Sequence, residues 1–499
     1  MDTIKDYYKN LYASIPFWWI VLVILCVEVV SFAGHNFDIV ETAAFAAIVA
    51  LTFVYSLRNL KIGVFILITE LFIGSKGYLF AVDIGSFSVS IRLALFLTVF
   101  AAYLIWLIRD RRIEFFRWSL WKEYSLVIVL IVVGVVIGVL RGNELTNIFL
   151  DTNGYLYFGL IGPYTQAIKS RDDSKQAIAL LFAGMTALGI KTLVILAMFS
   201  QISVLEFTLP GIYRWIRDTG VGEITRFENG FSRIFFQSHF YMIVPFFFVL
   251  AHMLLIKTKT AWKNKTVLST VALFGLSMLV LFLSYSRSFW AGLAGTIIVG
   301  SLWLLIRRKV TIKRLIIVGA ICIAVFAIDY AIAFGLVNIP LPGNVGVGAS
   351  SLLIERTQNI SDEPAAATRW QSLDPLMDAA LEHPLIGSGL GKTVTYISSD
   401  PRVLEESPDG SYTTFAFEWG YLDLFLKYGI VGLLIYAMFF IELFRKGLKQ
   451  IQSNKQQPIE VVGFILVLLA MLAINVFTPY LNHPLGIGLI IMASLALTL

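Results

Sequence analysis

The chain alternates between long apolar runs and short charged segments. An α-helix needs ~20 apolar residues to cross a bilayer, and by that measure the runs predict about fourteen spans. They lie near 15–32, 39–57, 62–80, 91–108, 124–140, 155–168, 177–200, 240–256, 266–283, 289–306, 315–335, 421–443, 459–477 and 484–498. The run at 155–168 is short, and the run at 62–80 is compatible with a partly re-entrant segment. The pattern predicts an all-α, polytopic transmembrane helix bundle.

Basic residues give this bundle an orientation. Lys and Arg are concentrated in every second connection, at 58–61, 109–122, 169–175, 257–265, 307–314 and 445–455. These connections share one side if the spans are right. Because cytoplasmic loops collect positive charge, that side is predicted to be cytoplasmic, with both chain termini on it.

Two long segments are then extracytoplasmic. One covers 201–239, and the other is a loop domain at 337–420, between the eleventh and twelfth spans. The predicted organisation is therefore helices 1–11 over 1–336, the loop domain over 337–420, and helices 12–14 over 421–499. Within the loop domain, apolar residues recur at helical spacing from Trp370 to Leu381, which predicts an amphipathic helix on the membrane surface or against the bundle.

Composition agrees with the span pattern. The chain is 58% hydrophobic and 14% charged, whereas soluble domains are about 45–50% apolar and about 25% charged. This excludes a soluble enzyme, a disordered chain and a disulfide-stapled secreted module. The basic residues of the cytoplasmic loops explain the formal net charge of +6. We therefore predict membrane lipids, and no nucleic acid, as partners.

Arginines on the predicted outer side are the most informative residues, because outward loops are normally poor in Arg. They are Arg214, Arg217, Arg226, Arg233 and Arg287. A guanidinium group suits two-point binding of phosphate oxygens. An anionic phosphate ligand at the outer surface would explain several of them at once.

These arginines fall into two groups. The first three share their segment with Asp218, Glu223 and Glu228, so ion pairs explain them at least as well as a ligand does. Arg233 and Arg287 each adjoin a span and have no acid next to them in the sequence. We therefore predict that Arg233 and Arg287 bind the phosphate ligand.

Other charged positions have simpler interpretations. Glu28, Glu70, Lys191, Asp329, Asp423 and Lys427 lie inside predicted spans. Asp423 and Lys427, at i and i+4, are predicted to form a structural ion pair, whereas Glu70 and Lys191 stay open between structure and function. The segment GSGLGKT at 387–393 lacks the first glycine of a phosphate loop, since Ile386 stands there. The histidines show no metal-ligand spacing.

Three segments together resemble the O-antigen ligase and O-antigen polymerase superfamily of bacterial envelope glycosyltransferases. LFLSYSRSFWAGLAGTIIVG at 281–300 is similar to that family's Ser-Arg-Ser/Gly turn before a helix rich in small residues. TRWQSLDPLMDAALEHPLIGSGLG at 368–391 is similar to its helix followed by His-Pro-Leu-x-Gly-x-Gly. FEWGYLDLFLKYGIVGLLIY at 417–436 is similar to its outer-face motif before Gly-Ile-x-Gly.

The resemblance implies a fold, a location and a chemistry. Members of this superfamily are polytopic glycosyltransferases, of the kind termed GT-C-like, that act at the outer face of the bacterial inner membrane. They take glycans from undecaprenyl diphosphate, by an inverting transfer that uses neither a metal nor another cofactor. Arg233 and Arg287 would then bind the donor's diphosphate, with Arg369 and Arg226 as further candidates. Donor and acceptor glycans, together with other polysaccharide assembly proteins, are the implied partners.

The chain departs from the family at one position. Glu418-Trp419 stands where the family's ligases have His-Asn. A base must take the proton from the acceptor hydroxyl, and a partly buried carboxylate can do so. Glu418 and His383 are therefore the candidate catalytic residues, although Glu418 could equally cap its helix and His383 could be a turn residue before Pro384.

The absence of that histidine favours a polymerase of undecaprenyl-diphosphate-linked repeat units, of O-antigen, capsule or exopolysaccharide type. A ligase that transfers the finished glycan to a lipid, protein or cell-wall acceptor is the first alternative. A lipid-linked oligosaccharide flippase or other transporter is the second. A scaffold of an assembly complex is a third.

Overall fold

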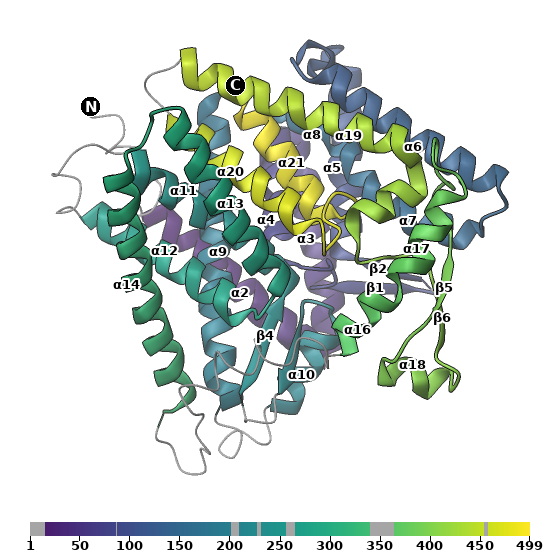
Figure 1. Ribbon diagram of the computed structural model, residues 1–499, viewed down its shortest axis with the longest axis horizontal. Helices are drawn as coiled ribbons and strands as arrows, with labels where there is room; N and C mark the ends of the chain where they lie inside the picture. The colour runs from purple at the N-terminus through teal and green to yellow at the C-terminus, as the bar shows by residue number, and fades with distance from the viewer. Residues whose placement is uncertain are drawn as a thin grey trace.

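The structure is a computed structural model that describes residues 15–85, 87–200, 209–226, 231–255, 265–339, 364–453 and 458–499 (Figure 1). The helices of the N-terminal part are α2 (Ile15–Asn36), α3 (Asp38–Arg58), α4 (Leu60–Ile73), α5 (Ile91–Asp110), η1 (Glu114–Arg117), α6 (Trp121–Leu140), α7 (Leu145–Tyr155), η2 (Leu156–Leu160), α8 (Ile161–Ala167), α9 (Arg171–Ser200) and α10 (Leu209–Asp218). Those that follow are η3 (Gln237–Met242), α11 (Ile243–Leu255), α12 (Lys265–Leu283), α13 (Arg287–Ile306), α14 (Ile312–Val337), α16 (Pro364–Gln371), α17 (Leu373–Leu381), α18 (Pro401–Glu406), α19 (Gly420–Ser453), α20 (Pro458–Ile474) and α21 (Pro484–Ala496).

Strands are few and short. Over the described residues they are β1 (Ala81–Ile84), β2 (Phe87–Ser90), β3 (Gly222–Arg226), β4 (Ser232–Phe236), β5 (Val394–Ile397) and β6 (Ser411–Thr414). Each strand pairs antiparallel with its neighbour in sequence, giving three two-stranded sheets. The protein is thus all-α in class, with small sheets confined to connections.

The helices confirm a polytopic membrane protein. Within the described ranges, nine helices are long and apolar enough to cross a membrane. They are α2, α3, α5, α6, α9, η3 with α11, α13, α14 and α19. Three shorter apolar helices, Ser269–Leu283, Ile459–Ile474 and Pro484–Ala496, accompany them. The figure of fourteen spans stays a prediction.

Two predicted spans differ from continuous membrane helices. The run at 155–168 is divided among the end of α7, the 3-10 helix η2 and the seven-residue α8. The run at 62–80 is helical only to Ile73, and the 14 residues of α4 give ~21 Å of helix, less than a bilayer core of ~30 Å. In both places a buried acid, Asp151 in α7 or Glu70 in α4, meets a basic side chain from another segment.

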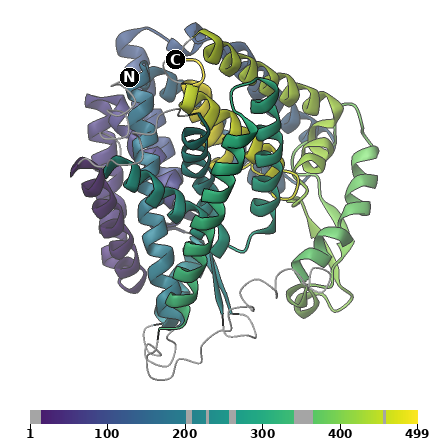
Figure 2. The same cartoon turned by 60° about the vertical axis from the view of Figure 1, so that its left-hand side comes forward.

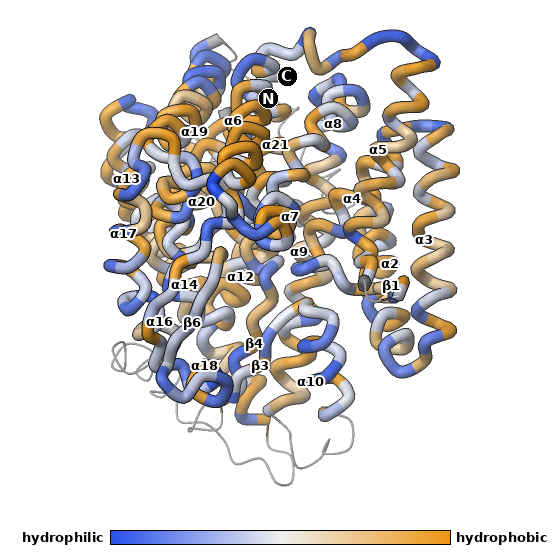
Figure 3. Tube along the Cα trace, turned by 90° about the vertical axis from the view of Figure 1, so that its right-hand side faces the viewer, coloured by the Kyte–Doolittle hydropathy of each residue, from blue (hydrophilic) through white to orange (hydrophobic). Residues whose placement is uncertain are grey.

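Three of the basic connections, at 58–61, 109–122 and 169–175, lie together, and the orientation of the bundle stays a prediction. Lys61 pairs with Asp173 at 2.8 Å, and Lys169 pairs with Glu114 at 3.4 Å. The guanidinium of Arg171 donates a hydrogen bond of 3.0 Å to the carbonyl of Leu499. The opposite end carries β3, β4, α10, α16 and α18 (Figures 1 and 2), and the tube between the two ends is predominantly hydrophobic (Figure 3).

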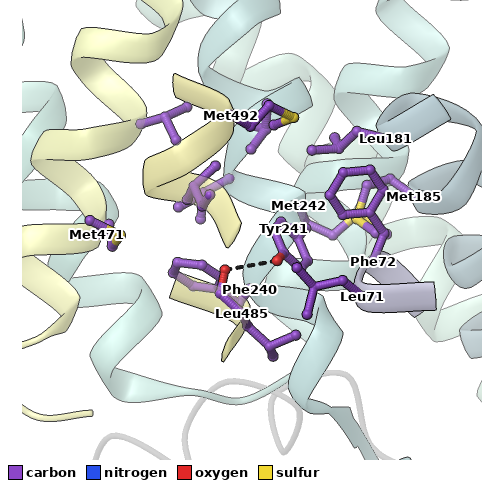
Figure 4. Packing of buried hydrophobic residues seen from close by; sticks show 14 of the residues in the cluster. Leu71, Phe72, Leu181, Met185, Phe240, Tyr241, Met242, Met471, Leu485 and Met492 are labelled. Atoms are coloured by element: carbon purple, nitrogen blue, oxygen red, sulfur yellow. Dashed lines mark hydrogen bonds between the residues drawn. The ribbon is translucent and has the colours of Figure 1, made fainter. Parts of the chain in front are cut away.

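The core lies where α4, α9, η3, α20 and α21 meet. Leu71, Phe72, Leu181, Met185 and Met492 are buried there (Figure 4). Tyr241 lies among them, and its hydroxyl donates a hydrogen bond of 2.7 Å to the carbonyl of Leu485. Burial without such a partner would be costly, so this bond fixes the start of α21 against η3.

Glu70 and Lys191, whose role inside the spans the sequence left open between structure and function, both form ion pairs. Glu70 accepts two hydrogen bonds from Arg92, at 2.9 and 3.0 Å, and Lys191 donates to Glu28 at 2.7 Å. The Lys191 ammonium also lies 4.7 Å from the ring centroid of Phe236 in β4. These contacts hold the β3–β4 hairpin against α9 and α2.

Three buried charged side chains form a cluster at the place where the loop domain meets the bundle. Lys427 of α19 lies 2.7 Å from Asp423 and 2.7 Å from Asp151, which confirms the predicted Asp423–Lys427 pair and adds a third member. Asn482 donates to the second oxygen of Asp423 at 2.8 Å. All three charged side chains are buried, so each depends on the others for its stability in this position.

The glycine-rich segment 387–391 packs directly over this cluster. The backbone N–H groups of Ser388, Gly389 and Leu390 donate to the carbonyls of Leu426, Lys427 and Gly134, and that of Gly391 donates to the Asp151 carboxylate at 2.9 Å. Gly389 has φ +80, and a Cβ there would lie 2.2 Å from the backbone nitrogen of Gly138. These N–H groups already donate to acceptors within the protein. The segment therefore attaches the loop domain to the bundle and does not bind phosphate as a phosphate loop would.

We expect Lys427→Met to lower the free energy of unfolding by about 3–5 kcal/mol, because two carboxylates would be left buried without their cation. The matched control is Lys449→Met, which changes an exposed lysine of the same helix. Thermal unfolding of the purified protein in detergent measures both. Equal melting temperatures for the two variants would contradict a stabilising role for the cluster.

Candidate functional site

The first predicted site residue is positioned by the β3–β4 hairpin. In its register Thr225 lies opposite Arg233, and Glu223 opposite Phe235. Because side chains alternate between faces, Arg233 shares one face with Glu223 and Phe235. Its guanidinium lies 4.9 Å from the ring centroid of Phe235 and donates a hydrogen bond of 2.8 Å to the carbonyl of Ser284.

The Ser284 carbonyl belongs to the turn that precedes α13. Tyr285 takes a left-handed conformation there, with φ +51, and Arg287 is the first residue of the helix. The hydroxyls of Ser286 and Ser288 are hydrogen-bonded at 3.0 Å, and Thr478 donates to Ser288 at 3.1 Å. The turn is therefore braced, and it brings Arg287 next to the hairpin that carries Arg233.

The outer loop domain supplies a third arginine and a carboxylate. Arg369 lies in α16, and its Nε donates to the carboxylate of Glu418, which immediately precedes Trp419 and α19. The indole N–H of Trp419 donates to the Arg369 carbonyl at 2.8 Å. The Glu418 side chain is 54% exposed, so the carboxylate is accessible from the surface.

Electrostatic effects show that the three arginines are neighbours. Burial lowers the pKa of Arg233 to about 10; Glu223 opposes that shift, and the positive charges of Arg369 and Arg287 add to it. Burial and the charge of Arg287 likewise lower the pKa of Arg369. All three stay cationic at neutral pH. Residues from three distant parts of the sequence thus form one concentrated positive site, which we call the arginine cluster.

The other two candidates are not brought into this cluster. Arg226 lies opposite Ser232 in the hairpin register, so it points to the face opposite Arg233, and it is exposed. His383 follows α17, and the carbonyl of its neighbour Pro384 accepts a hydrogen bond from Ile430. Ile430 follows the break in α19 at Gly429, and the helix from Gly420 to Gly429 places about 14 Å between that break and the Glu418 end. His383 and Glu418 are therefore separated.

Arg214 and Arg217 are hydrogen-bonded to other groups than the acids that the sequence suggested as their partners. Arg214 donates to the carbonyl of Pro210 at 3.4 Å, and Arg217 to the hydroxyl of Tyr213 at 3.3 Å. Asp218 lies 3.7 Å from His35. Glu228 lies outside the described residues. These two arginines are thus bonded within α10 and do not join the arginine cluster.

Sequence reasoning missed several residues around the site. Arg92 and Asp151, the partners of Glu70 and Lys427, were not singled out, because Arg92 begins an apolar run and Asp151 lies in a polar connection. Phe477 and Thr478 were also missed, since the link from α20 to α21 carries no charge. Their contacts with Trp419 and Ser288 come from the packing of helices far apart in sequence.

The geometry suits a ligand with several negative oxygens. Three guanidinium groups lie in partial burial, where charge-assisted hydrogen bonds are strong, and among the described residues the carboxylates of Glu223 and Glu418 act on them. Among the described residues, no group of three or more His, Cys, Asp or Glu side chains could hold a metal ion.

The fold and this site define a polytopic membrane protein with a cluster of three arginines at one end of its bundle. Residues 272–437 match the family model described as O-antigen ligase. The matched region includes Arg287, Arg369 and Glu418, but not Arg233. It confirms the resemblance to the O-antigen ligase and polymerase superfamily, and it supports a glycosyltransferase-like enzyme of that type. No curated protein and no solved structure matches the chain.

We expect Arg233→Ala and Arg287→Ala each to weaken binding of undecaprenyl diphosphate by about tenfold to a hundredfold, the loss of one or two charge-assisted hydrogen bonds. Chain growth should be abolished while the protein stays in the membrane. Arg217→Ala, an exposed arginine at the same end of the bundle, is the control. Normal-length polysaccharide from both cluster variants would refute the assignment.

Proposed function

We propose that this protein is an inner-membrane glycosyltransferase that polymerises undecaprenyl-diphosphate-linked polysaccharide repeat units. The reaction takes place at the extracytoplasmic face by an inverting, metal-independent transfer. One observation carries the proposal: Arg233, Arg287 and Arg369, from three separate segments, converge beside the carboxylate of Glu418. The family match over 272–437 supports the same class of chemistry.

The arginine cluster acts on the leaving group. As the bond between the donor's anomeric carbon and the phosphate oxygen breaks, negative charge grows on the diphosphate. Arg233 and Arg287 stabilise that charge, the role that preorganised cations play for a developing anion. The acceptor hydroxyl attacks the anomeric carbon from the opposite face, which inverts its configuration.

Glu418 receives the proton of that hydroxyl. It is the accessible carboxylate next to the cluster, and its partner Arg369 is itself one of the three arginines. A diphosphate that engages Arg369 competes with Glu418 for the same guanidinium. Donor binding therefore releases the carboxylate to act as the general base, so that the base becomes active only when a donor is present.

A ligase is the second candidate. It is favoured by the description of the matching family model as O-antigen ligase. It would use the same donor site and the same leaving group. The two functions differ in the acceptor, which is either the next repeat unit or a different lipid, protein or cell-wall molecule.

The reaction product decides between these functions. Purified protein is incubated with an undecaprenyl-diphosphate-linked repeat unit, with and without a lipid A-core acceptor, and the glycans are separated on a gel. A ladder is the result expected of a polymerase. A single shifted product that requires the second acceptor indicates a ligase, and an unchanged substrate with both acceptors would refute glycosyl transfer.

We expect Glu418→Gln to lower the rate of transfer by about a hundredfold or more, since general-base catalysis contributes typically 10²–10⁴-fold. Donor affinity should stay equal or improve, because Arg369 no longer has an anionic partner. Single-turnover rates and donor titrations measure the two effects separately. Asp378→Asn, an exposed acid of α17, is the control. A transfer rate equal to that of the wild type would show that Glu418 is not the base and only caps the helix.

A further inference from the structure

Three aromatic rings form a continuous wall that leads outward from the arginine cluster. The ring centroids of Phe477 and Trp419 lie 5.6 Å apart, and those of Trp419 and Trp370 lie 5.4 Å apart. At its inner end the wall reaches the cluster, since Thr478, next to Phe477, is bonded to Ser288 beside Arg287. We call these three residues the aromatic wall.

The outer ring of the wall is exposed although it lies in a well-packed domain. Trp370 is 63% exposed, while Leu376 of α17 and Leu426 of α19 are buried in the small core between these helices. The fold therefore does not need this indole for burial. Trp419 is held from below by its hydrogen bond to the Arg369 carbonyl, so the wall is rigid.

We propose that the aromatic wall is a sugar-binding subsite that holds the first pyranose rings of the lipid-linked donor, next to their diphosphate on the arginine cluster. This inference rests on the proposed function. The rings of Phe477, Trp419 and Trp370 contact the faces of these sugars.

The chemistry of the wall fits a neutral sugar. The face of an aromatic ring is electronegative, and the axial C–H groups of a pyranose carry partial positive charge and pack on such faces. The amide of Gln371, the residue after Trp370, is hydrogen-bonded to the hydroxyl of Ser399 at 3.0 Å. Both residues are exposed, so their polar groups are candidates to bind sugar hydroxyls. The net charge of −7 on the loop domain, from eleven acidic and four basic residues over 337–420, disfavours a polyanionic glycan.

The position of the wall selects the donor over the acceptor. A donor glycan is covalently joined to its diphosphate, so its first sugars must lie where a surface adjoins the arginines. The wall begins beside Ser288, the residue after Arg287, and continues to Trp370, the residue after Arg369. Both of its ends are thus next to cluster arginines.

Binding of two lipids separates the wall from the cluster. Purified protein in nanodiscs is titrated with undecaprenyl diphosphate and with the same lipid carrying one repeat unit. We expect Trp370→Ala to raise the Kd for the glycan-bearing lipid about tenfold, the value of one aromatic contact, and to leave the Kd for the bare lipid unchanged. Trp370→Phe should restore most of the affinity, and Arg287→Ala should weaken binding of both lipids.

Tyr412→Ala, which changes an exposed aromatic residue of β6, is the control and should alter neither Kd. Equal Kd values for Trp370→Ala and the wild type would overturn the proposal. So would a rise only in the KM for the acceptor, which would move the wall to the acceptor side. A variant that loses only membrane retention would also overturn it, because Trp370 would then be an interfacial anchor. If the wild type binds both lipids as expected but forms no product, the subsite stands and the polymerase proposal fails.

Discussion

The burial of a lysine between two aspartates is the constraint on which the outer half of the molecule depends. Lys427 cannot be held in the apolar interior without Asp423 and Asp151, because removing charges from water costs several kcal/mol per ion unless they are paired. The pairing fixes α19 against the broken segment α7–η2. It also fixes the glycine-rich loop, since Gly391 donates to the same Asp151. The start of α19, where Glu418 and Trp419 lie, is thereby set.

The need to compensate buried charge also explains how the arginine cluster is assembled. Three guanidinium groups repel one another, and their mutual effect is visible in the lowered pKa values of Arg233 and Arg369. The carbonyl of Ser284 and the carboxylates of Glu223 and Glu418 offset part of this repulsion. A multiply charged anion would offset more of it. We propose a diphosphate as that anion, with the Arg369–Glu418 pair as the point of exchange when a donor arrives.

Much of the fold could be predicted because the length and hydropathy of each apolar run indicate a membrane helix without reference to the rest of the chain. A helix in a bilayer satisfies its backbone hydrogen bonds internally, so length and hydropathy suffice for α2, α5 or α13. The Asp423–Lys427 pair was predictable for the same local reason, since both residues lie on one helix. The segment 155–168 was not, because η2 and α8 pack against α21, which lies near the other end of the sequence. The amphipathic pattern from Trp370 to Leu381 predicted one helix, which the structure divides at Ser372 into α16 and α17. Of these, α17 buries Leu376, Ala379 and Ala380 against α19.

The sequence by itself determined the class of protein, the connections in which basic residues gather, and the two arginines that stand out at the opposite end of the bundle. Those properties follow from hydropathy and charge, which are local along the chain. Only the tertiary structure decided that Arg369 and Glu418 join Arg233 and Arg287, that Arg226 and His383 do not, and that Phe477 continues the surface made by Trp370 and Trp419. The physical reason is that these contacts are made between segments far apart in sequence, and no local pattern encodes which helices will lie side by side.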